Sequence, residues 1–136
     1  MTDFRRVTDH LAVSPQITPA DVAEAKARGF TTLINNRPDG EAPDQPTSAQ
    51  IEQAAREAGL AYIHIPVRGL PPTPEQVEQT RAAIEGSEGP VLAFCRTGTR
   101  CINLWSMGER QAGRDRDELL KLGADAGYDL SGALAG

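Results

Sequence analysis

The sequence is poor in aromatic residues, in cysteines and in long apolar runs. Of its 136 residues only 4% are aromatic, and two are cysteines. Two cysteines cannot build a disulfide framework in a chain of this length, so each has to be explained singly. No apolar run approaches the ~20 residues that span a bilayer. The N-terminus carries charges with no apolar segment behind them, unlike a secretory signal. We therefore expect a cytoplasmic protein with no membrane partner.

The sequence also lacks an excess of basic residues. Fourteen lysines and arginines stand against nineteen aspartates and glutamates, which gives a net charge of −5. A broad nucleic-acid surface is normally basic, so we expect no nucleic-acid partner. The rest of the composition, 39% hydrophobic and 24% charged, is that of an ordinary globular protein. The length predicts a single domain over residues 1–136.

Short apolar runs rich in strand formers recur about thirty residues apart, which is the spacing of strand–helix–strand units. These runs are Thr31–Asn35, Ala61–Ile65 and Val91–Phe94. Between the first two, one helix face is formed by Ile51, Ala54, Ala55 and Ala58. A solenoid would show a similar period, but these units share a pattern and not residues. We predict parallel strands joined by right-handed crossovers.

The ends of the predicted helices are marked by capping residues. Hydroxyl N-caps stand at Thr18, Thr47 and Thr73, and glycines stand at the expected C-cap positions Gly29, Gly59 and Gly86. Phe4–Val7 and Leu11–Val13 are predicted to add an edge hairpin, and a last helix to cover about Arg116–Gly123. The predicted fold class is α/β, a single domain with a central, mainly parallel sheet of about 4–5 strands flanked by helices.

The segment Cys95–Cys101, after the third apolar run, is the main candidate site, because ligands of such sheets bind beyond the carboxyl ends of the strands. Its N–H groups and the following helix N-terminus can cradle an anion. The same field lowers the pKa of Cys95 and favours a reactive thiolate. In the alternative, Cys95 is only a small buried residue at a strand end. Arg96 and Arg100 argue against a purely structural role for Cys95. An apolar strand is seldom followed by a glycine-containing loop with two arginines unless the loop binds an anion.

This loop resembles the phosphate loop of cysteine-dependent protein tyrosine and dual-specificity phosphatases. Over nearly the whole chain the similarity is closer to a bacterial family, the beta-lactamase-hydrolase-like phosphatases (DUF442). The resemblance is carried by Ile17–Pro19, Ile34–Glu41, Gln45–Pro46, Tyr62–Val67, the loop itself and Gly127–Leu130. It implies a fold like that of protein tyrosine phosphatases and a small anionic substrate or a phosphorylated protein as the partner.

The resemblance further implies a phosphocysteine mechanism that needs no metal and no cofactor. Cys95 would attack a phosphomonoester, and the loop would hold the phosphate oxygens. The implied phosphate-binding residues are Arg96, Thr97, Gly98, Thr99 and Arg100.

The sequence departs from the phosphatase pattern at several points. Four residues separate Cys95 from Arg100, one fewer than in familiar tyrosine phosphatases and the same number as in rhodanese-type sulfurtransferases. No carboxylate occurs over residues 68–72, where phosphatases place a general acid, and its loss costs a factor of about 10²–10⁴. Phe94 stands where phosphatases commonly have a histidine. Cys101 stands where they commonly have a serine or threonine after the arginine. The alternatives are therefore a sulfurtransferase carrying a persulfide on Cys95, and a non-catalytic module that binds an anion or a phosphoprotein.

A second loop, Asn35–Glu41, follows the first apolar run and is either an ordinary turn or one border of the Cys95 pocket. In the second case Arg37 helps to bind the anion, and Asp39 or Glu41 replaces the missing acid. We favour Asp39.

Three further residues have simpler structural interpretations. His64 and Trp105 are best explained by packing. Cys101 packs under its helix more simply than it captures an oxidised Cys95 as a disulfide.

Overall fold

The computed structural model describes residues 2–135, which form one sheet with helices on both faces. The strands are β1 Arg5–Arg6, β2 Leu11–Ser14, β3 Thr32–Asn35, β4 Ala61–His64 and β5 Val91–Phe94. The helices are α1 Pro19–Ala27, α2 Ser48–Ala58, α3 Pro74–Glu85, α4 Thr99–Gln111 and α5 Arg116–Asp125. The predicted edge hairpin is formed by β1 and β2, and the last helix runs two residues beyond the predicted Gly123.

The five-stranded sheet has the order β1-β2-β5-β3-β4. Only β1 is antiparallel to its neighbour, and the other pairs are parallel. This confirms the predicted α/β class with a mainly parallel sheet. Because β5 lies at the centre, the residue after it, Cys95, comes to the point where the carboxyl ends of β2, β3 and β5 meet.

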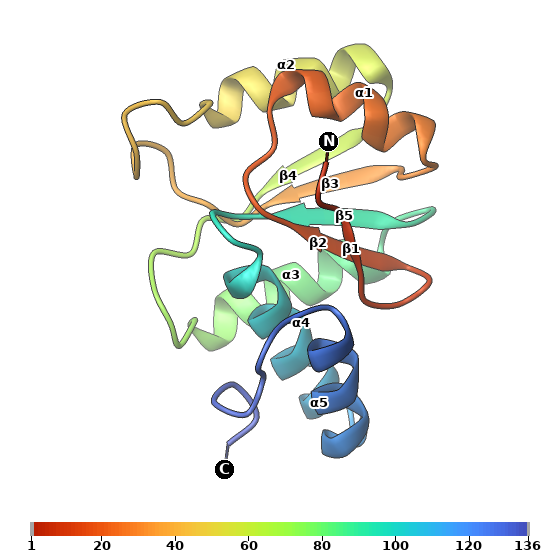
Figure 1. Cartoon of the computed structure of the whole chain (residues 1–136), viewed down its shortest axis with the longest axis vertical. Helices are drawn as coiled ribbons and strands as arrows, with labels where there is room; N and C mark the ends of the chain where they lie inside the picture. The colour runs from red at the N-terminus through yellow and green to blue at the C-terminus, as the bar shows by residue number, and fades with distance from the viewer. Residues whose placement is uncertain (1, 136) are drawn as a thin grey trace.

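The two faces of the sheet are covered by different helices. Figure 1 shows α1 and α2 on one face and α3, α4 and α5 on the other. Successive residues of a strand point to opposite faces. Leu92 and Phe94 of β5 therefore pack with the α1–α2 core, whereas Ala93 and Cys95 pack with the core that contains Cys101 of α4. The sequence pattern thus turns both cysteines toward one side of the sheet.

The helix starts are those that the sequence predicts. Thr18, Thr47 and Thr73 each form a capping box with the residue three positions later. Gly59 caps α2 and Gly86 caps α3, but α1 is capped by Arg28, one residue before the expected Gly29. Within residues 2–135, no helix has both the length and the apolar character needed to cross a membrane.

Candidate functional site

The loop between β5 and α4 turns back over Cys95. Cys95 has no solvent exposure, and the backbone N–H of Gly98 donates a hydrogen bond to its Sγ over 3.1 Å. Gly98 is the N-cap of α4 and has a φ of 88°, a left-handed conformation that favours glycine. The turn therefore places the sulfur at the N-terminus of a helix, where backbone N–H groups stabilise negative charge.

Cys95 is a thiolate at neutral pH in this setting. Its pKa is lowered to about 5, chiefly by the hydrogen bond from the Cys101 thiol and further by backbone N–H groups of the loop, against the opposing effect of burial. Burial, together with the neighbouring Cys95, raises the pKa of Cys101 well above its ordinary value. Cys101 therefore remains a neutral thiol, the form that can donate a hydrogen bond to the Cys95 sulfur.

Arg100 is held by a carboxylate from the loop after β3. Its Nη1 and Nη2 donate to Glu41 Oε2 and Oε1 over 2.9 and 2.8 Å, and Nη1 also donates to the Val67 carbonyl over 2.7 Å. Arg37 Nε donates to the same Glu41 Oε1 over 3.0 Å. The structure thus brings together Arg37 and Arg100, both predicted to bind the anion, through one shared carboxylate.

Of the two carboxylates considered as a substitute acid, Glu41 is the one in contact with Arg100. Asp39 is exposed, and its Oδ1 accepts the backbone N–H of Ser48 over 2.8 Å at the start of α2. Hydrogen bonds from Arg100 and then Arg37 lower the pKa of Glu41. In this arrangement Glu41 is an anion that orients two arginines, and it carries no proton to donate.

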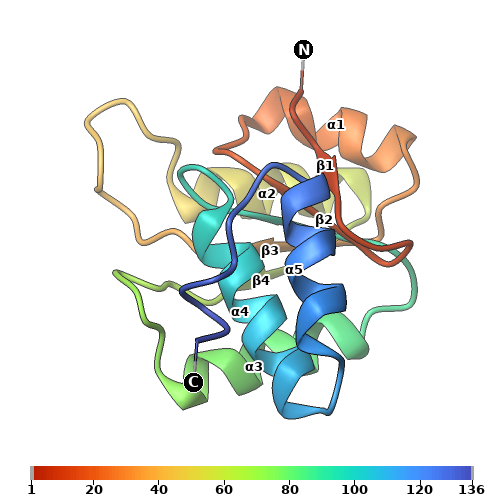
Figure 2. The same cartoon turned by 60° about the horizontal axis from the view of Figure 1, so that its bottom comes forward.

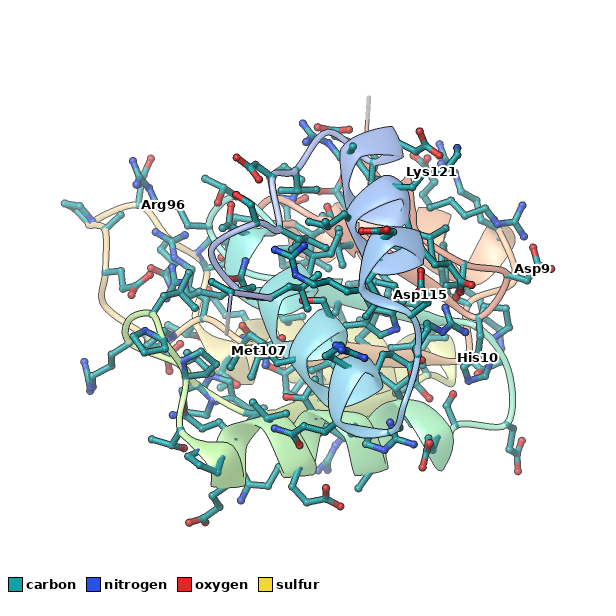
Figure 3. All side chains as sticks on the ribbon, turned by 90° about the horizontal axis from the view of Figure 1, so that it is seen from below. Asp9, His10, Arg96, Met107, Asp115 and Lys121 are labelled. Atoms are coloured by element: carbon teal, nitrogen blue, oxygen red, sulfur yellow. The ribbon has the colours of Figure 1, made fainter. Side chains whose placement is uncertain are left out.

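The remaining loop residues lie at the open side of the site. The side chains of Arg96 and Thr97 are exposed, and the Thr97 hydroxyl donates to the Thr99 hydroxyl over 2.9 Å. Figure 3 shows Arg96 on the opposite side of the molecule from Asp9 and His10, which precede β2. Arg96 therefore marks the carboxyl end of the parallel strands.

His64 and Trp105 have the structural roles that the sequence suggests. His64 Nε2 lies 2.8 Å from the carbonyl oxygen of Arg37, which ties the end of β4 to the loop after β3. Trp105 is 5% exposed within the core beneath α4. Among residues 2–135, no three histidine, cysteine, aspartate or glutamate side chains gather where they could hold a metal ion.

Tyr128 contacts the loop and was not among the site residues predicted from the sequence. Its hydroxyl donates to the Thr97 carbonyl over 2.7 Å, and Arg5 lies over its ring, 5.1 Å from the centroid. A Cβ atom on Gly98 would collide with this hydroxyl. Figure 2 shows the segment after α5 returning beside the start of α4. The only signal in the sequence was its place in the segment Gly127–Leu130 that carries the family resemblance.

Comparison with known proteins identifies the family of the chain. Residues 3–113 match the family model described as Beta-lactamase hydrolase-like protein, phosphatase-like domain. A Beta-lactamase hydrolase-like protein of Xylella fastidiosa is 40% identical over 129 residues, which are 94% of this chain. The chain spans only 30% of the length of that relative.

Solved structures give the same assignment. The crystal structure of a candidate phosphatase from Neisseria meningitidis is 38% identical, with a TM-score of 0.87 over 97% of this chain and 94% of the other. The structure of Tk-PTP, at 20% identity and a TM-score of 0.70 over 93% and 86% of the two chains, shows the shared fold alone. The family match includes Cys95, Arg100 and Glu41, whereas Tyr128 lies beyond it. The chain therefore belongs to the family of phosphatase-like domains of beta-lactamase hydrolase-like proteins, with a fold like that of protein tyrosine phosphatases.

Proposed function

We propose that the chain is a cysteine-dependent phosphatase that hydrolyses a phosphomonoester through a phosphocysteine on Cys95. The observation that carries the proposal is the Cys95 thiolate at the floor of an N–H-lined loop, with Arg100 fixed beside it. Such a loop supplies a nucleophile and an oxyanion site together. Membership of a phosphatase-like family supports the same reaction class.

In the proposed first step, Cys95 Sγ attacks phosphorus in line with the ester oxygen. The S–P bond forms as the P–O bond to the organic group breaks, and the organic group leaves with the bonding pair. The N–H groups of residues 96–100 and the Arg100 guanidinium stabilise the charge on the equatorial oxygens. Glu41 keeps Arg100 oriented, and Arg37 reinforces that carboxylate.

In the proposed second step, water attacks phosphorus, phosphate departs, and Cys95 leaves as a thiolate. The Cys101 thiol, which donates to the Cys95 sulfur, stabilises that leaving group. No carboxylic acid contacts the loop among residues 2–135 except the anionic Glu41. Aryl esters, whose leaving groups need little protonation, are therefore expected to react faster than alkyl esters.

The substrate class and the setting follow from the same site. Two proteins of this fold are described in complex with phosphotyrosine and with PI(5)P. A small phosphorylated molecule or a phosphorylated protein is the corresponding partner here. A cytoplasmic setting belongs to the proposal, since a reducing compartment protects so acidic a thiol from oxidation.

Two observations favour a second candidate, a sulfurtransferase of the rhodanese type. The loop has four residues between Cys95 and Arg100, and the one carboxylate that contacts it has no free proton. In a sulfurtransferase, Cys95 accepts a sulfur atom to become a persulfide and then passes that atom on. No alcohol leaves in this reaction, so no acid is needed to protonate one. A non-catalytic anion-binding module is the third reading of the same loop.

The test compares purified protein on p-nitrophenyl phosphate, on an alkyl phosphate, and on thiosulfate with cyanide. We expect turnover of the aryl ester, slower turnover of the alkyl ester, and loss of both in Cys95→Ser. Activity only with thiosulfate would replace the phosphatase by the sulfurtransferase. Unchanged rates in Cys95→Ser would overturn both enzymes, and phosphate binding without turnover would identify the module.

A further inference from the structure

A groove beside the Cys95 loop takes no part in the chemistry described above. It is bounded by the loop after β4 with Leu70 and Pro71, by one side of α4 with Thr99 and Met107, and by the C-terminal segment with Ala133. In Figure 2 the loop after β4 and the end of the C-terminal segment lie on the same side of α4, and Figure 3 labels Met107 on that side. Three segments far apart in the sequence thus build one hollow.

Part of the groove surface is apolar and open to solvent. Leu70 is 46% exposed and is the only exposed large hydrophobic side chain in residues 2–135. Its neighbours Pro71 and Met107 give the hollow further apolar walls. The volume of about 580 Å³ lies within the roughly 300–1,000 Å³ of small-molecule sites.

The groove is continuous with the Cys95 loop through Thr99. This residue lines the groove and is also the first residue of α4, directly after Gly98, whose N–H contacts the Cys95 sulfur. The Asn103 side chain, a further lining residue, donates to the Thr99 carbonyl over 2.8 Å and fixes this junction. The groove therefore adjoins the loop in which the phosphate is proposed to sit.

The charge of the groove disfavours an organic part that carries further negative charge. Among the described residues that line it, Asp129 is the only charged one. The Asp129 carboxylate accepts the backbone N–H of Ser131 over 2.9 Å, and this hydrogen bond lowers its pKa, so it is anionic at neutral pH. The exposed Arg68 is close in sequence but does not line the hollow. Additional phosphates on the organic part would meet negative charge there.

We propose that this groove binds the uncharged, apolar organic group of a small phosphomonoester whose phosphate sits in the Cys95 loop. The proposal rests on the phosphatase function proposed above and names its substrate class. It predicts preference for a monophosphate with an apolar body over a polyphosphorylated sugar of similar size.

The test uses phenyl phosphate and its 4-methyl, 4-ethyl, 4-propyl and 4-butyl derivatives. Their phenols have similar acidities, so the chemical step changes little along the series. We expect kcat/KM to rise about two- to fourfold for each methylene that enters the groove. Leu70→Ser is expected to flatten this rise. Gly132→Phe is expected to abolish it by filling the groove, since a Cβ at Gly132 meets no atom within 4 Å.

The matched control is Ala124→Phe, which adds the same ring on the exposed surface of α5 and should keep both the rise and the basal rate. Equal kcat/KM along the series in the wild type would overturn the groove and leave the phosphatase standing. Faster hydrolysis of an inositol polyphosphate than of the butyl ester would also overturn it.

If the wild type hydrolyses none of these esters, the phosphatase proposal fails. The affinity of the protein for the same esters then tests whether the groove binds their organic groups. Calorimetry with Cys95→Ser and the same esters then measures Kd. A Kd that falls about two- to fourfold for each methylene supports the groove. A Kd independent of chain length overturns it.

Discussion

Cys95 owes its low pKa to hydrogen-bond donors held around its sulfur. The Cys101 thiol is the strongest of these, and the Gly98 N–H lies 3.1 Å away. Both donors belong to the start of α4, where Gly98 is the N-cap and Cys101 lies in the first turn, and Tyr128 from the segment after α5 binds the carbonyl before Gly98. The reactivity of one atom therefore depends on contacts that can be removed one at a time.

Removal of the thiol donor is predicted to raise the pKa of Cys95. Cys95 is anionic above its pKa of about 5, so its alkylation rate should fall as the pH drops through that value. In Cys101→Ala this fall should move to higher pH, toward the ordinary thiol value, whereas Cys101→Ser keeps a donor and should restore most of the shift. The rate of iodoacetamide labelling as a function of pH measures the pKa of Cys95 in each variant. An identical pH profile in Cys101→Ala would contradict the donor role.

Loss of the Tyr128 hydroxyl is predicted to loosen the loop. Tyr128→Phe removes the hydrogen bond to Thr97, worth about 1 kcal/mol, and should lower kcat about fivefold while raising the pKa of Cys95. The thiolate absorbance against pH reports that pKa independently of turnover. Tyr62→Phe is the control, since its hydroxyl contacts Ser48 and Asn35 instead. A change of thermal stability with an unaltered thiolate titration would show that Tyr128 is only structural.

At the scale of elements, the helices are delimited by local chemistry that is independent of the site. The Thr73 hydroxyl accepts the Gln76 N–H over 3.1 Å, and the Gln76 side chain accepts the Thr73 N–H over 2.9 Å. This reciprocal pair satisfies two donors at the start of α3 that the helix itself cannot satisfy. Because the contacts are local in sequence, they were predictable from it.

Thr73→Ala is predicted to lower the free energy of unfolding by about 1 kcal/mol. The physical reason is that the alanine leaves the Gln76 N–H without its protein acceptor. Urea denaturation monitored by circular dichroism measures the loss, and Thr73→Ser, which keeps the hydroxyl, should recover it. Equal stability of the alanine and serine variants would show that this cap contributes nothing.

At the scale of the whole molecule, two arginines of an acidic protein meet at the carboxyl end of its parallel strands. The net charge is −5, yet Arg37 and Arg100 converge on Glu41 from the loop after β3 and from α4. These two segments are 59 residues apart in the sequence at the Arg100–Glu41 contact. The contact joins the two sides of the site, so its strength should appear in global stability.

The Glu41 contacts are predicted to make stability depend on pH in the acid range. The arginines lower the Glu41 pKa below the ordinary 4.5, so the contribution is complete above that value and is lost as pH falls through the lowered one. Glu41→Gln should lower the free energy of unfolding by about 1 kcal/mol at neutral pH. The variant should also lose less stability than the wild type as the pH falls, because it has no carboxylate to protonate at this position. Urea midpoints across the acid range measure both. A variant with the pH dependence of the wild type would contradict the assignment.

The sequence by itself determined the parallel sheet, the three capped helix starts and the loop from Cys95 to Arg100. These follow from periodicity, capping and turn chemistry, which act between residues close in the chain. Only the tertiary structure decided that Glu41 rather than Asp39 contacts Arg100, that Cys101 packs with Cys95 and lowers its pKa, and that Tyr128 covers the loop. The reason is geometric: such contacts depend on how distant segments pack and which way each side chain points, and no local pattern encodes that.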